Sequence, residues 1–352
     1  MSDQSRHSGD ADNKPDSSPE PSQKGPVSPA RGFSGGKHRR PFGKPRDGRP
    51  GRPPTRVYQL VVNRLAGGER ELPIRLARRL ERRLRRSGWH SEMHIANTWD
   101  DFVQKATMAA RQRPFSVVVF GGDGSVRLAA SLVSRVKGLL GIVPCGRHNN
   151  IFHSLYGHTD FDQAMNIVRS EFQMRIDAGL ANSNFFVGSL VSGMVPAMLE
   201  RLGDKKLPRL TMAWGKLAAR AADDTMPQSV TIKVDASTFR AQPLILHVHL
   251  LPDLMTLRFA PGAAPDDGRI IVLYDREGTR DVAAHYIRDL KKQKYQYTNG
   301  VQMIRGGKVT ISPAAGRVWL IDGDRIEFSG EDIGIEVLHR VLRVFSDAPK
   351  EE

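Results

Sequence analysis

The segment from Phe115 to Ser125 constrains the fold more than any other part of the sequence. The apolar run Phe115 to Phe120 leads directly into the turn Gly121-Gly122-Asp123-Gly124-Ser125, and a helix is expected near 125–136. Glycine lets the backbone approach an anion, and the start of a helix adds partial positive charge, so this arrangement is typical of loops that bind phosphate. Many strand-to-helix turns need glycine for geometry alone, but the order of strand, aspartate and helix favours phosphate binding.

Strands and helices alternate on both sides of this turn. The apolar run from Val57 to Val62 predicts a buried strand, and four leucines from Leu72 to Leu84 recur at a spacing of four, which predicts a helix over 72–86. Such alternation predicts βαβ units, and hence a three-layer α/β domain whose parallel sheet is covered by helices on both faces. The remaining helices and strands of this part are expected near 99–112, 139–143 and 161–169.

From Asp177 onward the pattern changes to short strands of alternating polar and apolar residues. Closely spaced strands of this kind predict a mainly antiparallel β-sandwich. Strands are expected at 184–188, 229–234, 244–250, 270–274, 308–312 and 317–321. Helices are expected near 193–202, 210–222 and 280–292.

Residues 1–56 form a basic tail with a different composition. They are rich in Pro, Gly, Ser and charge and almost lack aliphatic residues, so they are predicted to be disordered. With 12 Lys or Arg and 6 Asp or Glu, they carry +6 of the chain's net charge of +15. The run from Lys37 to Arg56 is of a kind that attracts anionic lipid headgroups or nucleic acid, or that serves only as a solubilising leader.

Composition narrows the compartment and the partners. The single cysteine, Cys145, excludes an intramolecular disulfide, and no apolar run reaches the roughly 18 residues needed to span a bilayer. No motif of aromatic and basic residues supports nucleic-acid binding beyond the tail. A cytoplasmic protein in peripheral contact with the anionic inner face of a membrane is therefore expected, and a homodimer is left open.

Several segments, taken in order, resemble the diacylglycerol kinase catalytic domain and the bacterial lipid kinases that contain it. GGDGS at 121–125 is similar to the family's GGDGT turn, and Asn63 with Gly67 and Gly68 stands where the family has an Asn-Pro turn followed by Ser-Gly. Gly141 to Asn150 resembles the family's Gly-Ile-Ile-Pro-x-Gly-Thr-x-Asn-Asp segment. Further matching segments follow at 177–193, 261–270, 321–324 and 333–345.

This resemblance implies the two-domain fold that diacylglycerol kinases share with NAD kinases. In the family the closing strand returns to the first domain, so the α/β nucleotide-binding domain would comprise 57–176 plus 330–346, and the β-rich domain 177–329. The implied reaction is ATP-dependent transfer of the γ-phosphate to the hydroxyl of a lipid substrate, of diacylglycerol or sphingoid type, with Mg²⁺ screening the phosphate charges.

The resemblance also implies roles for individual residues. Asp123 would act at the nucleotide phosphates, and Asp267 would be the general base toward the acceptor hydroxyl, although Asp266-Asp267-Gly268 taken alone is typical of a hairpin turn. No residue is assigned as a metal ligand. Residues expected to bind the nucleotide are Asn63, Gly121, Gly122, Asp123, Gly124, Ser125, Gly146, Arg147 and Asn149.

Several positions depart from the family pattern. Arg147 and Asn150 replace the Thr and the final Asp of the family segment, and Arg127 and Leu128 replace an Asn and a Glu. The glycine-rich stretch before the Asp-Gly pair is also replaced, by residues 254–259. Arg147 can hydrogen-bond a phosphate through two N–H groups, or fill the space of a nucleotide. Two alternatives therefore stay open. One is a degenerate family member that binds nucleotide or lipid without turnover. The other is an NAD kinase, although the last hundred residues of this sequence resemble lipid kinases more than NAD kinases.

Two further candidates carry less weight. His247 and His249 lie two apart, hence on one face of the expected strand, and would need a third ligand to hold a metal; a polar strand face is the commoner case. Cys145 has His148 and His153 nearby in sequence, but a nucleophilic cysteine also requires a base oriented in space.

Overall fold

The computed structural model describes residues 57–112, 115–170, 172–203, 205, 207–293, 300–330 and 332–347. The tail of residues 1–56, which the composition predicts to be disordered, lies outside the described residues. All described residues fall within one unit, which runs from Lys44 to Glu352.

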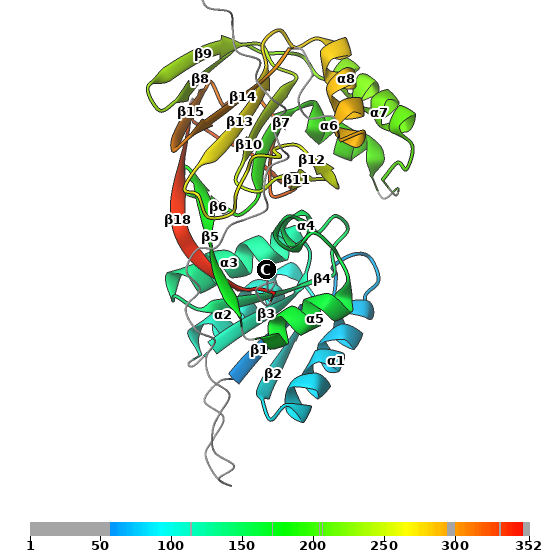
Figure 1. The fold of residues 1–352 in the computed structure, drawn as a ribbon, viewed down its shortest axis with the longest axis vertical. Coiled ribbons are helices and arrows are strands. Elements are labelled where there is room, and N and C mark those ends of the chain that lie inside the picture. Colours follow the sequence, from blue (N-terminus) through cyan, green and yellow to red (C-terminus); the bar gives the residue numbers. More distant parts are fainter. Residues whose placement is uncertain are drawn as a thin grey trace, which may run out of the picture. The chain divides into compact units, whose positions relative to one another are not determined.

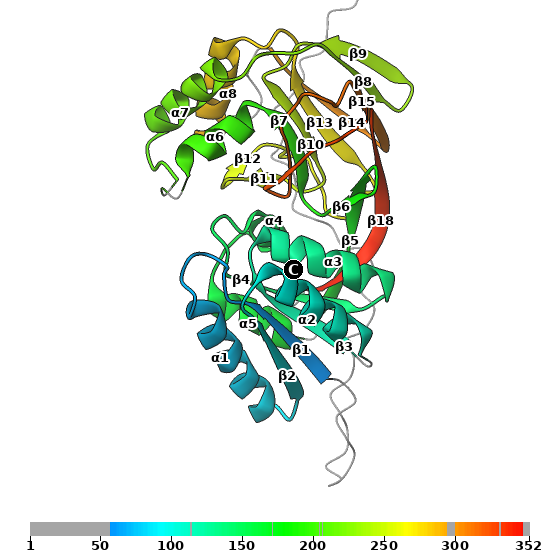
Figure 2. The ribbon, with the colours of Figure 1, turned by 180° about the vertical axis from the view of Figure 1, so that it is seen from behind.

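The first part of the chain forms a parallel sheet with helices on both faces (Figures 1 and 2). Its strands pair in the order β2-β1-β3-β4, all parallel. Helices α1 and α5 pack together on one face and α2 and α3 on the other, which confirms the predicted three-layer arrangement. The elements are β1 Val57–Asn63, α1 Leu72–Arg86, β2 His90–Ala96, α2 Trp99–Arg111, β3 Phe115–Gly121, α3 Asp123–Arg135, β4 Leu139–Pro144 and α5 Phe161–Ser170.

Two elements of this part had no clear sequence signal. Strand β2 is at the edge of the sheet, and His90 and Glu92 face outward, so it lacks the apolar run that marks β1 and β3. Helix α4, Asn150–Tyr156, has only seven residues, which is too short for helical periodicity to show in the sequence.

Strand β18, Ile333–Phe345, joins the two parts of the fold. Its end pairs in parallel with β4, its start pairs antiparallel with β15, and β5, Gln173–Ala181, runs along most of its length. Leu338 pairs with Ala178 and Leu342 with Ile176, so four steps along β18 match only two along β5, and the strand bulges. The sheet continues through β15 Lys308–Ser312, β8 Val230–Val234 and β9 Ser237–Ala241, while β6 Asn184–Phe186 extends β5.

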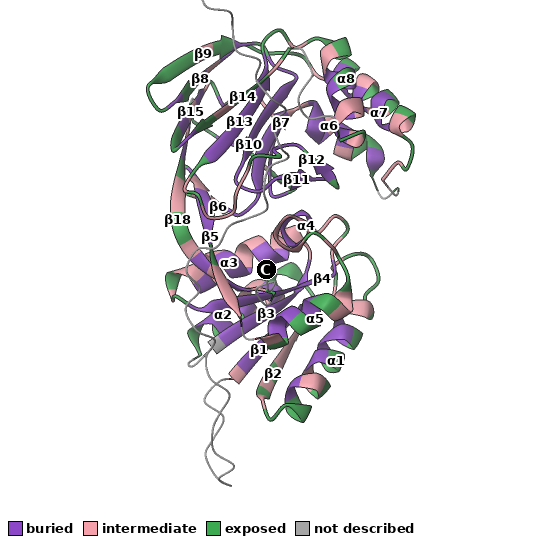
Figure 3. Cartoon of the chain, in the orientation of Figure 1, coloured by how far each residue is buried: buried purple, intermediate pink, exposed green. Residues whose placement is uncertain are grey.

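A second, antiparallel sheet packs on the far half of the first. Its strand order is β14-β13-β10-β7-β16-β17, and one face shares an apolar core with β5, β8, β15 and β18. The opposite face packs against three helices, and the central strands are buried along their length (Figure 3). The predicted sandwich is thus confirmed. Its elements are β7 Ser189–Gly193, α6 Met194–Leu202, α7 Thr211–Asp223, β10 Ile245–His249, β11 Asp253–Leu254, β12 Leu257–Arg258, β13 Ile270–Asp275, α8 Arg280–Lys291, β14 Val301–Gly306, β16 Trp319–Ile321 and β17 Asp324–Ile326.

Because β18 packs in both cores, a destabilising substitution at either end of the strand should shift the same unfolding transition to lower denaturant. We expect Ile335→Ala, in the sandwich core, and Leu342→Ala, in the α/β core, each to lower the free energy of unfolding by about 2–5 kcal/mol. Denaturation followed by circular dichroism should show one shifted transition for both variants. The exposed Glu336→Ala on the same strand should leave it unchanged, and two separately shifted transitions would contradict the expectation.

Candidate functional site

Strand order places the ends of β1 and β3 at a crevice. In the sheet, β2 lies next to β1 on one edge, whereas β3, the following strand in the chain, lies next to β1 on the opposite edge. The order of the strands therefore reverses between β1 and β3. Parallel α/β sheets bind ligands at such points, beyond the carboxyl ends of the strands. Asn63 ends β1 and donates a hydrogen bond from Nδ2 to Oγ of Ser125 at 2.9 Å. Both side chains are buried, so this pair fixes the glycine turn to β1.

Three turns meet here with their backbones in direct contact. A Cβ atom on Gly146 would lie 2.4 Å from Cα of Gly122, and one on Gly67 would lie 2.2 Å from the carbonyl oxygen of Cys145. The amide of Cys145 also donates to the carbonyl of Gly121 at 2.9 Å. Gly67 has a positive φ of 73°, which favours glycine independently of the space around it. Glycine at Gly67, Gly122 and Gly146 is therefore required by close packing of the turns.

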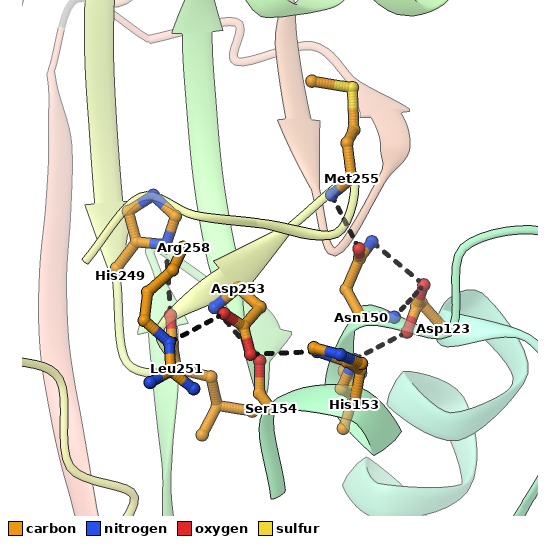
Figure 4. A network of polar contacts seen from close by, with 10 residues as sticks. Asp123, Asn150, His153, Ser154, His249, Leu251, Asp253, Met255 and Arg258 are labelled. Carbon is orange, nitrogen blue, oxygen red and sulfur yellow. Dashed lines mark hydrogen bonds and ion pairs between the residues drawn. The ribbon is translucent and has the colours of Figure 1, made fainter. Parts of the chain in front are cut away.

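The carboxylate of Asp123 binds the start of α4 (Figure 4). Oδ1 accepts a hydrogen bond from the amide of Ile151 at 2.9 Å, and Oδ2 accepts from the amide of Asn150 at 3.0 Å and from its Nδ2 at 3.2 Å. Desolvation raises the pKa of Asp123 to about 7, the two amide donors oppose this rise, and the nearby carboxylates of Asp322 and Asp324 add to it. Asp123 thus joins the glycine turn to α4, a link that the sequence did not reveal.

Asn150 extends the same network into the second part of the fold. While its Nδ2 donates to Asp123, its Oδ1 accepts a hydrogen bond from the amide of Met255 at 2.8 Å. An ionised aspartate, as the family has here, could not donate to Asp123, so the amide suits this bridge. The neighbouring Asn149 has a φ of 52° and exchanges two hydrogen bonds with the backbone of Gly146, at 2.8 and 2.9 Å, which hold that turn closed.

Two further aspartates lie near the glycine turn, Asp322 in the connection between β16 and β17 and Asp324 at the start of β17. Asp322 is buried and accepts hydrogen bonds from the amides of three successive residues, 187 to 189, at 2.7 to 2.9 Å; desolvation raises its pKa. Asp324 forms an ion pair with Arg127 of α3 at 2.7 Å, and a Cβ atom on Gly124 would lie 2.5 Å from its Oδ2. Arg127, a departure from the family, therefore ties α3 to the second sheet.

A small cavity lies between these groups. It has a volume of about 10 Å³, about the size of a single water molecule, and Asp123, Asp253 and Asp322 are among the residues that line it. Asp253 is itself engaged by His153 at 3.1 Å and Arg258 at 3.2 Å (Figure 4). Within the described residues no group of three His, Cys, Asp or Glu side chains could hold a metal ion. Sequence reasoning assigned no role to Asp253 or Asp322, because the contacts that tie each to the site span long stretches of sequence, 100 residues from His153 to Asp253 and 133 from Ser189 to Asp322.

Arg147 extends from the Gly146 turn to another segment. Its Nη1 donates to the carbonyl of Gly203, directly after α6, at 2.6 Å, and the residue is exposed. The side chain thereby connects the edge of the candidate site with the α6–α7 connection.

Asp267 lies in the turn before β13. Its Oδ1 accepts from the amide of Arg269 at 2.9 Å, and its Oδ2 is 3.9 Å from a guanidinium nitrogen of Arg305. The buried Asp177 holds this turn by accepting from the amides of Gly268 and Arg340, each at 2.7 Å. No hydrogen bond or ion pair in the described part of the chain joins Asp267 to Asp123, so its role as general base stays a prediction.

The expected polar strand face at His247 and His249 is wrong. Both side chains are fully buried, and the ring of Phe259 lies against them with centroids 4.9 and 6.0 Å away. Burial lowers the pKa of both, to about 4 for His249, so both imidazoles are neutral at pH 7. Cys145 is also buried, and desolvation raises the pKa of its thiol to about 12, so it stays protonated and is a poor nucleophile.

The fold combines a glycine turn at the edge of a parallel α/β sheet with an antiparallel sandwich, and comparisons with known proteins show what the chain is similar to. Residues 58–181 match the family model of the diacylglycerol kinase catalytic domain. A Streptococcus pneumoniae protein named "Putative lipid kinase" is 27% identical over 301 residues, 83% of this chain and 98% of that protein. A Staphylococcus saprophyticus protein named diacylglycerol kinase is 20% identical over 277 residues, 76% of this chain and 88% of that protein.

A solved structure supports the fold. The crystal structure of a "putative diacylglycerol kinase" from Bacillus anthracis superposes with a TM-score of 0.66 at 16% identity, covering 83% of this chain and 95% of that chain. The family resemblance predicted from the motifs is therefore confirmed: residues 58–181 match the model of the diacylglycerol kinase catalytic domain, and the chain is similar to diacylglycerol-kinase-like lipid kinases.

The contact between Gly122 and Gly146 can be tested by adding one methyl group. We expect Gly146→Ala to lower the free energy of unfolding by about 1–3 kcal/mol, because its Cβ would meet backbone that cannot move aside easily. Gly307→Ala is the control, since its Cβ would have only one neighbour, at 3.8 Å, and the change there should stay within about 0.5 kcal/mol. Equal effects in urea denaturation would contradict the close contact.

The raised pKa of Asp123 predicts a pH dependence of stability. Between about pH 4 and pH 7 the folded state keeps a proton on Asp123 that the unfolded state releases, so this group makes the protein less stable as the pH rises. Measured by urea denaturation, the stability difference between wild type and Asp123→Asn should therefore change across this range. The exposed Asp100→Asn should run parallel to wild type. Parallel curves for all three proteins would rule out a raised pKa at Asp123.

Proposed function

We propose that the protein is a lipid kinase that transfers the γ-phosphate of ATP to the hydroxyl of a lipid of diacylglycerol or sphingoid type. The observation that carries the proposal is the meeting of three glycine turns at the crevice between β1 and β3, inside the segment that matches the catalytic domain family. Phosphoryl transfer depends chiefly on positioning and charge neutralisation, which such a backbone cradle supplies.

The residues of the crevice fit a nucleotide phosphate. Helix α3 begins at Asp123, so the first amides of α3 have no partner within their own helix and can donate to an anion. Gly122 and Gly146 let the two turns pack backbone against backbone, which would fix the turn amides beside a bound phosphate, and Asn63 with Ser125 would hold the turn in place. Glycines 121 and 124 and residues 147 and 149 are proposed as the remaining parts of this binding site.

Mg²⁺ would reach the site with the nucleotide. Mg²⁺ commonly binds through one or two carboxylates, substrate phosphates and water, so the absence of a three-ligand group in the described residues is compatible with it. When bound, the ion would neutralise phosphate charge; Asp123 belongs to the glycine turn, and the carboxylates of Asp322 and Asp324 are close enough to raise its pKa.

Asp267 is the proposed general base. Its residue is exposed and its carboxylate has no partner closer than the amide of Arg269, so a hydroxyl could reach it. A carboxylate in hydrogen-bond reach of the acceptor would take the hydroxyl proton as the oxygen attacks phosphorus. Because the acceptor is a lipid, the enzyme would work in peripheral contact with the inner, anionic membrane face; no helix among the described residues is long and apolar enough to cross a membrane.

One observation favours a second candidate, a protein that binds nucleotide without turnover. Both carboxylate oxygens of Asp123 are engaged by α4 and Asn150, which leaves this acid less available to a ligand than a free carboxylate would be. Under this alternative ATP would raise the melting temperature, while no lipid would be phosphorylated.

A kinase assay with diacylglycerol, ceramide and sphingoid bases in mixed micelles tests the proposal. With Mg-ATP, the wild type should phosphorylate at least one of these lipids, and Asp123→Ala should abolish the activity. Asp267→Asn should lower kcat by about 10²-fold or more with little change in KM, because a base acts in the transition state. Asp266→Asn is the matched control, since the side chain of Asp266 is bound to Arg340 instead.

Two results would count against this assignment. If the folded wild type phosphorylates none of these lipids but is stabilised by ATP, the binding alternative replaces the kinase. If Asp267→Asn and Asp266→Asn keep equal activity, another residue must be the base.

A further inference from the structure

Two large apolar side chains are exposed at the start of α7. Leu210 is 73% exposed and Met212 is 68% exposed, although α7 buries Trp214 and Ala218 on its other face. The segment is held in place, because Nε1 of Trp214 donates to the carbonyl of Pro208 at 2.8 Å. Leu210 and Met212 are therefore exposed to water from a segment that is itself folded and held in place.

Positive charge continues along the same side of α7. Lys216 and Arg220 follow Met212 at intervals of four, so the three exposed residues lie along one stripe of the helix, and Arg209 directly precedes Leu210. We call the set Arg209, Leu210, Met212, Lys216 and Arg220 the α7 face.

The α7 face contains no acidic residue of its own. Residues 205–222 contain no Asp or Glu. The next two acids along the chain are each engaged by an arginine outside the face, Asp223 by Arg280 at 2.8 Å and Asp224 by Arg201. The face therefore presents three cations and no acid of its own segment, a composition that suits an anionic partner.

We propose that the α7 face docks the protein on the surface of an anionic membrane. Leu210 and Met212 would enter the boundary between headgroups and acyl chains, while Arg209, Lys216 and Arg220 would contact lipid phosphates. Apolar side chains ringed by cations match the layered chemistry of a bilayer surface better than that of nucleic acid, which would make no use of Leu210 and Met212. The proposal rests on the proposed function, since it names the surface through which a lipid kinase would meet its substrate.

The position of the α7 face relative to the glycine turn supports this role. Arg147, next to Gly146 of the nucleotide crevice, donates to the carbonyl of Gly203, where the chain leaves α6 on its way to α7. Figure 4 shows that Asn150 links Asp123 to Met255, while a neighbouring set of contacts runs from His153 of α4 through Asp253 to Arg258. A membrane bound to the α7 face would therefore contact Arg209 and Leu210 in the α6–α7 connection, whose first residue, Gly203, is bound by Arg147.

Vesicle co-sedimentation of the full chain, without ATP or acceptor lipid, tests the docking surface separately from catalysis. Leu210→Ser with Met212→Ser should weaken binding to phosphatidylcholine vesicles containing phosphatidylserine by about tenfold, because two apolar side chains no longer leave water. Met226→Ser with Met303→Ser is the matched control: both residues are exposed, at 85% and 47%, but lie outside the face. Lys216→Gln with Arg220→Gln should reduce the dependence of binding on salt and on phosphatidylserine.

A fluorescent label gives a readout that folding defects would not imitate. Cys145 is the chain's only cysteine and is buried, so Met212→Cys can be labelled selectively with an environment-sensitive dye. Vesicles should shift the emission of dye at 212 to the blue, and leave dye at Met226→Cys unchanged. Wild-type binding by the Leu210 and Met212 double variant, with no shift at 212, would overturn the docking surface. Loss of kinase activity with intact vesicle binding would instead count against the proposed function.

Discussion

The carboxylate of Asp123 is the contact on which the rest of the site depends. Asn63 ties the glycine turn to the end of β1, but this contact does not reach the segment after β4. By accepting the first amides of α4, Asp123 holds the glycine turn against the segment after β4, and Asn150 carries the connection on to Met255. Hydrogen bonds to a charged carboxylate are stronger than those to a protonated one. The strength of these contacts therefore depends on the protonation state of Asp123, whose pKa is raised by desolvation.

Three of the departures from the family pattern share one structural property. Arg127 pairs with Asp324, Arg147 donates to the carbonyl of Gly203, and Asn150 accepts from the amide of Met255. Each contact joins the first part of the chain to the second part across the candidate site. These three side chains therefore strengthen the connection between the two parts of the fold.

Periodic segments could be predicted from sequence, and contacts between distant segments could not. Helix α1 and strands β1 and β3 have strong apolar patterns, and the structure confirms them. The bridge from Asn150 to Met255 spans 105 residues, and no local signal marks it. The spacing of His247 and His249 correctly predicted that they share one face of a strand. Their burial could not be predicted, because it depends on Phe259, which lies ten residues beyond His249 in the chain. The glycines were recognised by family pattern, while their reason, backbone contact between two turns, needs coordinates.

The bulge in β18 limits how this chain can change length. Ile333 and Ile335 point into the sandwich core, whereas Leu342 and Val344 lie in the α/β core, so the regularly buried positions are odd-numbered before the bulge and even-numbered just after it, with Phe345 also buried at the strand end. Side chains alternate along a strand, so gaining or losing one residue in the bulge would turn one half inside out, while a change of two would restore both faces. Relatives of this protein should therefore differ here by even numbers of residues.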